Sequence, residues 1–326
     1  MRIALDAMGG DRAPQVPVQG ALLAAHEGVE VLLVGEEARL REELARHRAS
    51  LPIHHAPDWI RMAEHATEVR RRRESSIMVA IDLLKRGEVG AVVSMGHTGA
   101  TMAAALFALG RVKGVERPAL LVEFPSQRGR TLLLDGGANA DCRPGFLVQF
   151  AAMGLAYAEA LGLPEAKVGL LSIGEEEGKG NALVLETYPL LRAAFGGRFY
   201  GNVEGRDVFL GTVEVVVTDG FTGNVVLKLA EGEAKVLLGW IKEALASSPL
   251  ARLGALLVRG ALRRVKERVD PAQYGAMPLL GVEGAVFVGH GAADALAVKN
   301  ALLRAKRLVE GGLMDRVRQS LAALHV

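Results

Sequence analysis

The sequence predicts an α/β protein, with a three-layer α/β/α sandwich built around a mostly parallel sheet. Aliphatic runs typical of strands alternate along the chain with segments whose apolar residues are spaced three and four apart, as in helices. Several aliphatic runs have no polar interruption, which is typical of strands buried on both faces of a parallel sheet. We expect residues 1–326 to form a single unit, extended by a helical amphipathic excursion at about 247–270.

Eight strands are expected, each because a run of Val, Ile or Leu ends at glycine or at a polar residue. They cover residues 2–7, 29–35, 90–96, 119–124, 131–137, 167–174, 213–220 and 284–291. Helical spacing follows several of these runs and predicts helices over residues 78–84, 101–109, 146–161 and 292–308. A further helix is expected after the strand at 213–220, where Leu227, Lys228, Ala230 and Glu231 have helical spacing.

The charge of the chain is nearly balanced, with 39 Lys and Arg against 37 Asp and Glu and a formal net charge of +2. This balance gives no reason to expect a nucleic-acid partner. The single cysteine, Cys142, cannot form an internal disulfide and is typical of a reducing compartment. No signal peptide is indicated, and no apolar run approaches the ~18 residues of a membrane span. We expect a cytoplasmic protein, and peripheral association with the inner face of the cell membrane stays open.

Glycine is unusually common, at 39 of 326 residues, and it gathers where the expected strands end. In open parallel sheets, ligands bind beside the carboxyl ends of the strands. We therefore expect the six polar glycine turns of the chain to meet at one crevice. They are DAMGGD (6–11), SMGHTGA (94–100), LDGGANAD (134–141), IGEEEGKGN (173–181), TDGFTGN (218–224) and GHGAAD (289–294).

Polar side chains in these turns suit the binding of an oxyanion. Four of the five Asn residues lie in or near glycine turns, where an amide either donates to an oxyanion or tolerates left-handed geometry. Lys179 lies between two glycines, so its ammonium is either accessible to a ligand or a solvated loop charge. His97 either orients a substrate or caps the helix that opens near Thr98. Cys142 is more typical of a structural cysteine than of a nucleophile, because no activating base adjoins it in sequence.

Several common kinds of site are not indicated. The aspartates of the turns have glycine neighbours, which favour turn and cap roles over a metal site; they are Asp6, Asp11, Asp135, Asp141 and Asp219. No G-x-G-x-x-G fingerprint follows the first strand and no G-x-x-x-x-G-K-[ST] occurs, so no dinucleotide or nucleoside triphosphate cofactor is predicted. The G-x-S-x-G elbow of serine acyltransferases is also missing. The remaining crevice of amides, Asn, His and Lys suits free phosphate.

In this order, the turns resemble those of the bacterial phosphate acyltransferases of phospholipid synthesis, the PlsX family. The resemblance spans residues 2 to about 305 and includes DAMGGDRAP, LDGGANADCRP, TDGFTGNVVLKLAEG and GHGAADALAVKNAL. It implies transfer of a long-chain acyl group from acyl-[acyl-carrier-protein] to inorganic phosphate, giving acyl phosphate for a membrane glycerol-3-phosphate acyltransferase. It also implies no cofactor, a homodimer, and a fold similar to isocitrate and isopropylmalate dehydrogenases and phosphotransacetylases.

The resemblance and the chemistry of the turns together assign the candidate site. As catalytic residues we expect Lys179, Asn181, Asn224 and His97, although the family pattern has Asn where this chain has His97. As residues that bind substrate or phosphate we expect Asp6, Gly9, Gly10, Asp11, Thr98, Gly99, Gly137, Asn139, Gly180, Asp219, Gly220, Thr222, Gly223 and His290. Phosphate has a pKa of ~6 to 7 for its second proton, so it is already an anion at neutral pH. The site therefore needs donors to the tetrahedral oxyanion more than a strong base.

The excursion at about 247–270 is expected to be one amphipathic helix. It places Leu250, Leu253, Leu257, Ala261 and Val265 on one face, with Arg252, Arg259, Arg263 and Lys266 largely opposite. A core-facing or dimer-packing helix, a membrane-surface helix and a docking site for the acidic carrier protein are all open readings of this pattern.

Two alternatives to the long-chain acyltransferase are also open. A phosphotransacetylase acting on short acyl-CoA would use similar phosphate chemistry. A non-catalytic lipid-binding regulator on the same fold is less consistent with the sequence, because a lipid pocket alone needs no phosphate cradle.

Overall fold

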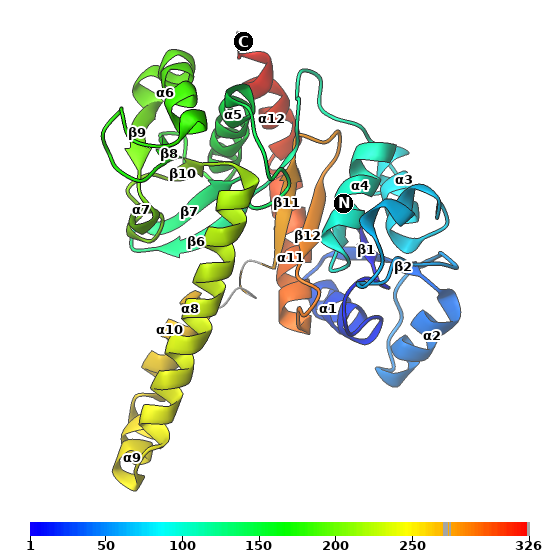
Figure 1. Cartoon of the computed structure of the whole chain (residues 1–326). Helices are drawn as coiled ribbons and strands as arrows, with labels where there is room; N and C mark the ends of the chain where they lie inside the picture. Colours follow the sequence, from blue (N-terminus) through cyan, green and yellow to red (C-terminus); the bar gives the residue numbers. More distant parts are fainter. Residues whose placement is uncertain (270–272, 274, 325–326) are drawn as a thin grey trace.

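The computed structural model of the chain describes residues 1–269, 273 and 275–324 (Figure 1). Its strands form two sheets, whereas a single sheet was expected from the sequence. The larger sheet has seven strands, which are parallel except at β11 and its two neighbours. Their order is β3 (Ile53–His55), β2 (Glu30–Gly35), β1 (Arg2–Asp6), β4 (Ala91–Ser94), β12 (Val286–Gly289), β11 (Ala276–Leu280) and β5 (Ala119–Leu120).

The smaller sheet has five strands and is parallel except for the pair formed by its edge strand β6 and β7. Their order is β6 (Val122–Ser126), β7 (Gly129–Leu134), β10 (Val215–Val217), β8 (Val168–Leu171) and β9 (Phe199–Val203). The chain passes from β5 into β6 through Leu121, whose amide donates to the Pro278 carbonyl of β11 at 3.1 Å. The two sheets are therefore adjacent at this crossing.

Helices cover both faces of the larger sheet. Successive residues of β1 point to different cores: Ile3 and Leu5 pack with α1, α2 and α11, and Ala4 packs with α3 and α4. This alternation explains why the strand is apolar throughout, since both of its faces are buried. The bounds are α1 (Gln15–His26), α2 (Glu37–Arg46), the 3₁₀ helix η1 (Ala66–Arg70), α3 (Ser76–Lys85), α4 (Thr98–Ala108) and α11 (Ala295–Glu310).

The smaller sheet is covered in the same way. Leu134 and Val217 pack towards α5 and α6, whereas Leu133 and Val216 pack towards α7 and the start of α8. The three-layer α/β/α prediction is thus confirmed for each sheet. The bounds are α5 (Pro144–Ala160), α6 (Ala182–Phe195), the 3₁₀ helix η2 (Gly196–Arg198), α7 (Gly205–Leu210), α8 (Gly220–Ala246) and α12 (Leu313–Ala322).

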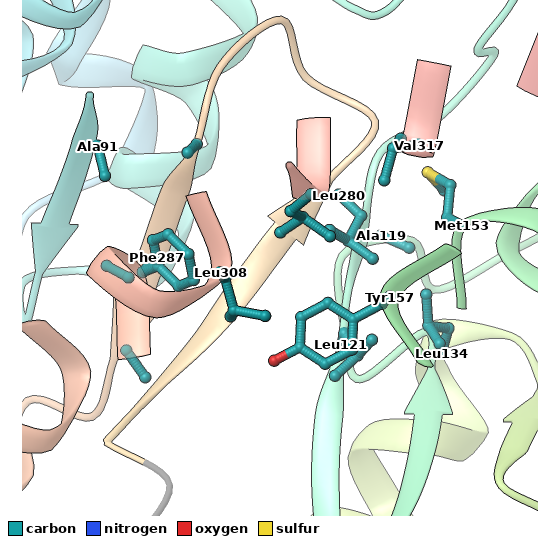
Figure 2. Packing of buried hydrophobic residues seen from close by; sticks show 14 of the residues in the cluster. Ala91, Ala119, Leu121, Leu134, Met153, Tyr157, Leu280, Phe287, Leu308 and Val317 are labelled. Carbon is teal, nitrogen blue, oxygen red and sulfur yellow. The ribbon is translucent and has the colours of Figure 1, made fainter. Parts of the chain in front are cut away.

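One hydrophobic core continues from one sheet to the other. Figure 2 shows it around Tyr157 of α5, with Phe287 and Leu308 on the side of the larger sheet and Leu134 on the side of the smaller one. The Tyr157 hydroxyl donates to the buried carboxylate of Glu123 on β6 at 2.8 Å, and Arg304 of α11 forms an ion pair with the same carboxylate. These contacts join the two halves of the molecule.

The amphipathic excursion extends away from the body of the protein (Figure 1). α8 carries the chain outwards, α9 (Pro249–Leu257) lies at the far end, and α10 (Arg259–Val269) returns. The expectation of a single helix is wrong, because α9 ends at Leu257 and a new helix begins at Arg259. Asp270, the last residue of the expected segment, lies outside the described residues. Leu250 and Leu257 are 79% and 81% exposed, so the core-facing reading is also wrong for this chain.

All eight expected strands contain an observed strand, although most are shorter than expected, and the run at 119–124 is divided between β5 and β6. Three observed strands were missed: β3, β9 and β11. Their sequences carry His54 and His55, Gly201 and Asn202, or Pro278, which weaken the aliphatic signal. Pairing with neighbouring strands, rather than composition, makes them strands.

Candidate active site

A cavity of about 980 Å³ lies where glycine turns of both sheets meet. Asp11, Thr98, Gly99 and His290 line it from turns that follow β1, β4 and β12 of the larger sheet. Gly137 and Asn224 line it from turns that follow β7 and β10 of the smaller sheet. Five of the six polar turns thus contribute residues, as the rule for the carboxyl ends of parallel strands predicts.

The sixth turn does not line this cavity. Lys179, Gly180 and Asn181 lie in the loop between β8 and α6, and the Lys179 side chain is exposed. Two side-chain hydrogen bonds fix this loop. The Ser172 hydroxyl donates to the Lys179 carbonyl at 3.0 Å, and the Asn202 side-chain amide donates to the Glu176 carbonyl at 2.8 Å. The expected convergence is therefore wrong for this turn, and the catalytic roles of Lys179 and Asn181 stay predictions.

The first turn is built around the buried carboxylate of Asp6. The hydroxyls of Ser76 and Ser94 donate to it at 2.6 and 2.7 Å, and burial raises its pKa above the ordinary range. Gly9 packs so closely that a Cβ would lie 2.7 Å from this carboxylate, and Gly10 has φ of +104°, which favours glycine. Asp6, Gly9 and Gly10 therefore shape the turn that presents Asp11, and none of the three lines the cavity itself.

The turn after β7 is organised in the same way by Asp135. Its carboxylate accepts from the amides of Leu120, Gly137 and Ala138 at 3.0 to 3.1 Å, and from the Asn139 amide at 2.7 Å. The pKa of Asp135 is raised because burial outweighs the opposite effect of hydrogen bonds from Ala138, Asn139 and Leu120. The Asn139 side chain also donates to Asp135, at 2.9 Å. Asn139 therefore supports the turn and is not among the residues that line the cavity.

The start of α8 packs directly on this turn. The Gly220 amide donates to the Asn139 carbonyl at 2.8 Å, and a Cβ on Gly223 would lie 1.9 Å from the Asp135 carbonyl oxygen. Asp219 caps the helix by accepting from the Thr222 amide and hydroxyl, both at 2.8 Å. Asp219, Gly220, Thr222 and Gly223 thus place the helix, and Asn224 is the residue of this turn that reaches the cavity.

Two of the expected catalytic side chains cap helices. His97 Nδ1 accepts from the Ala100 amide at 3.2 Å at the start of α4, and the Asn181 side chain accepts from the Val184 amide at 3.0 Å at the start of α6. The capping alternative for His97 is confirmed. The first amides of any α-helix lack intrahelical partners, and in α4 these include the amides of Thr98 and Gly99. They lie at the positive end of the helix dipole.

The polar end of the cavity is suited to an anion. The first turn of α4 reaches it through Thr98 and Gly99, and helix N-termini attract phosphate and carboxylate groups. α8 reaches it one turn further along, at Asn224. The Asn224 amide lies 3.3 Å from the Gly136 carbonyl at this end, and His290 Nδ1 accepts from the Ala292 amide at 3.2 Å. This arrangement offers hydrogen-bond donors without a nucleophilic side chain.

Sequence reasoning missed most of the cavity wall. Beyond the turns, its lining is mainly apolar, and these residues come from β6, α7, α8 and β11: Val122, Phe124, Pro125, Phe209, Leu227, Ala230, Ala234, Met277 and Pro278. Arg304, Lys228 and Arg268 also line it; burial lowers the pKa of Arg304 to about 10. No local signal marks these residues, because they meet only through packing of the two sheets. The position of Arg304 among the buried alanines and leucines of α11 was the one feature of the sequence that could have indicated this part of the cavity.

Cys142 lies outside this cavity, against the turn that contains Asn139. Its thiol lies 3.6 Å from the Asn139 carbonyl, and burial raises its pKa to about 11. At neutral pH the thiol is protonated, so it is a poor nucleophile. Within the described part of the chain, no group of His, Cys, Asp and Glu side chains is arranged to hold a metal ion.

Comparison with known proteins identifies the family to which the chain belongs. The family model described as fatty acid synthesis protein matches residues 1–316. The chain is 81% identical over 326 residues, the full length of both, to a phosphate acyltransferase of Thermus thermophilus. It is 50% identical over 331 residues to that of Pelotomaculum thermopropionicum, covering all of this chain and 96% of the relative.

Solved structures share the fold at low sequence identity. A phosphotransacetylase from Streptococcus pyogenes superposes with a TM-score of 0.63 at 15% identity, covering 95% of this chain and 94% of its own. A 4-hydroxythreonine-4-phosphate dehydrogenase from Klebsiella pneumoniae gives 0.56 at 13% identity, covering 95% and 99%. Since the family model and the full-length relative agree, this chain belongs to the PlsX family of phosphate acyltransferases and is an acyltransferase.

Proposed function

We propose that this acyltransferase moves a long-chain acyl group from the thioester of an acyl carrier protein to inorganic phosphate. The products are acyl phosphate, for a membrane glycerol-3-phosphate acyltransferase, and the free carrier protein. The observation that carries the proposal is the cavity, which joins the anion-binding turns to a long apolar continuation. A phosphotransacetylase for short acyl-CoA would need no such continuation.

The site supports direct attack by phosphate. Held at the N-terminus of α4 and beside Asn224 of α8, phosphate is oriented towards the thioester carbonyl, and its oxygen forms a bond to the carbonyl carbon. The Asn224 amide and the first amides of α4 donate to the tetrahedral oxyanion. The C–S bond then breaks, and the carrier thiolate leaves with the electron pair. No acyl-enzyme intermediate is required, and none of the steps uses a metal or a nucleotide.

Thiol release tests the proposal. Purified protein is mixed with palmitoyl carrier protein or acetyl-CoA, with and without phosphate, and the free thiol and acyl phosphate are measured. We expect release from palmitoyl carrier protein only when phosphate is present. Turnover of acetyl-CoA alone would support the phosphotransacetylase instead. Loss of activity with a chelator, restored by a divalent metal, would contradict the metal-free mechanism.

We also propose a homodimer that forms along α8, in which residues 1–326 of each copy act as one catalytic unit. The outer face of α8 carries Phe221, Val225, Leu229, Val236 and Trp240, which are 48 to 68% exposed and mostly four residues apart. The cavity-lining residues Leu227, Ala230 and Ala234 lie on a different face of the same helix. A continuous exposed apolar stripe of this kind is typical of an interface.

The excursion supports a position at a membrane surface. Leu250, Leu253, Leu256 and Leu257 are exposed on α9, and α10 adds a cluster of arginines. Among the described residues, no helix is long and apolar enough to cross a bilayer. We propose that the excursion rests on anionic lipid, so that the enzyme stays cytoplasmic and peripheral. Co-flotation with anionic but not with neutral vesicles would support the lipid contact. Binding of carrier protein by the excursion, without co-flotation, would contradict it and support a docking site.

A further inference from the structure

The cavity is divided chemically along its length. At one end lie the polar turns with Asn224 and Gly137, and at the other lie apolar side chains of β6, α7 and α8. Met277 of β11 lies nearer the polar end, because it pairs with Val288 just before the His290 turn. Phe124 and Phe209 meet there edge to face, with ring centroids 5.7 Å apart, and Leu227 and Ala230 pack against the same cluster. The cavity therefore leads from an anion site into an apolar channel.

The two long walls of the channel start at the same end. Val122 of β6 is opposite Leu133, next to the Asp135 turn, and β6 leads from there to Ser126, about 14 Å away at ~3.4 Å per residue. Asn224 of α8 contacts the same turn, and Ala234 lies about 15 Å further along the helix at ~1.5 Å per residue. Both walls therefore extend a similar distance from the anion site.

Two of the three basic side chains along this stretch form ion pairs. Lys228 is paired with Glu231 at 2.8 Å, and Arg304 with the buried Glu123. Arg268 of α10 donates to the Ser126 carbonyl at 2.9 Å, at the end of β6 far from the turns. Because Lys228 and Arg304 are paired with carboxylates and Arg268 lies at the far end, most of the channel offers a ligand apolar contact.

We propose that this channel binds the acyl chain of the substrate, with the carbonyl at Asn224, and that α8 measures the length of the chain. The proposal rests on the proposed function above and adds where the chain lies. The volume supports it: about 980 Å³ is more than six times the ~150 Å³ cavity that accepts benzene. Each methylene buried in the channel contributes a factor of about four to affinity, so chain length is read as binding energy.

Ala230 and Ala234 are the positions that set the length. They lie one turn apart on the cavity-facing side of α8, about 9 and 15 Å from Asn224 at ~1.5 Å per residue. Small side chains there leave the channel open. A large side chain at Ala234 would close its deep end, and one at Ala230 would close it nearer the anion site.

Chain-length profiles test the proposal. The kcat/KM for octanoyl, dodecanoyl and palmitoyl carrier protein is compared among wild type, Ala230→Trp and Ala234→Trp. We expect Ala234→Trp to lose about 100-fold with palmitoyl, equivalent to several methylenes left unburied, while octanoyl stays close to wild type. Ala230→Trp should also lower the kcat/KM for dodecanoyl carrier protein. Ala194→Trp, at an exposed alanine near the end of α6, is the matched control and should keep the wild-type profile.

The outcomes separate the channel from the reaction. A wild-type profile in both cavity variants, or an equal loss at every length with an unchanged Tm, would overturn the channel. If a Trp variant unfolds, Ala234→Leu repeats the comparison with a smaller side chain, and an unshifted profile there overturns the proposal as well. Failure of wild type to release thiol from any acyl carrier protein would instead contradict the proposed function.

Discussion

Asn224 and Lys179 show at the scale of single residues that similar glycine-rich turns can lie in different places. Both lie in glycine-rich turns and both were expected to act on phosphate. Only Asn224 lines the cavity, where its amide lies 3.3 Å from the Gly136 carbonyl. Lys179 projects from a separate loop and is exposed.

Asn224→Ala should lower the rate of phosphorolysis about 100-fold, since removing one oxyanion donor typically costs that much. The Tm should change little, because the side chain is exposed towards the cavity and buries little apolar surface. The measurement is single-turnover thiol release alongside thermal unfolding. A wild-type rate would reduce Asn224 to a support for its turn.

Lys179→Ala tests the residue that lies outside the cavity. If the Lys179 ammonium contacts phosphate from its exposed loop, the variant loses a charge-assisted bond worth roughly 1.5 to 3 kcal/mol, and the reaction should slow about ten- to a hundredfold. Asn181→Ala is a useful comparison in the same loop, because it removes the cap of α6 and should lower stability by about 1 kcal/mol. An unchanged rate in Lys179→Ala would restrict the site to the five turns that line the cavity.

Cys142 gives a prediction about pH. Its raised pKa, about 11, means that the reactive thiolate is scarce at pH 8, so alkylation by iodoacetamide should be slow and should accelerate about tenfold per pH unit. Denatured protein is the control, since its thiol has an ordinary pKa. Cys142→Ala should keep most activity, and an acyl group trapped on Cys142 would contradict direct attack by phosphate.

At the scale of elements, the junction of β10 and α8 explains why a strand ends in Asp-Gly-Phe-Thr-Gly-Asn before becoming a helix. Asp219 caps the helix, while Gly220 and Gly223 let its first turn touch the Asp135 turn without a Cβ. The glycines thus serve close packing between two turns, and that packing brings Asn224 to the cavity.

Gly223→Ala should therefore be strongly destabilising. The added Cβ would lie 1.9 Å from the Asp135 carbonyl oxygen, and the required shift of α8 should cost about 3 kcal/mol, with loss of activity. Gly205→Ala at the start of α7 meets nothing within 4 Å and should stabilise the protein by about 0.5 to 1 kcal/mol. Urea unfolding of both variants compares them, and equal stabilities would refute the packing role.

At the scale of the whole molecule, the exposed apolar stripe of α8 is the surface that the proposed dimer would cover. The helix has 27 residues, about 40 Å at ~1.5 Å per residue, and much of its length projects from the body (Figure 1). A second copy that covers the stripe would bury Leu229 and Trp240 and fix the direction of the excursion on both subunits.

The double variant Leu229→Glu with Trp240→Glu should convert the dimer into a monomer, because two charges would be buried without partners at the interface. Light scattering after size-exclusion chromatography measures the mass. Leu185→Glu on α6, a 43% exposed leucine outside the stripe, is the control and should remain dimeric. A monomeric wild type, or a double variant that stays dimeric, would contradict an interface along α8.

The sequence by itself determined the fold class, the approximate place of eight strands, and the turns that form the polar end of the cavity. These features are local: β-branched runs favour strands, and glycine with Asn or Asp favours turns at their ends. Turn residues such as Asp11, Thr98, Asn224 and His290 could therefore be identified from the amino-acid pattern alone.

Only the tertiary structure decided the rest. It separated the strands into two sheets, excluded the Lys179 loop from the cavity, and brought Phe124, Leu227 and Met277 together from distant segments. It also placed Asp6 and Asn139 outside the lining of the cavity, in contacts that support their turns. Helical and strand periodicities report which face of an element is buried, but not against which other element. The apolar channel depends on that second choice, which is made by packing across the whole chain.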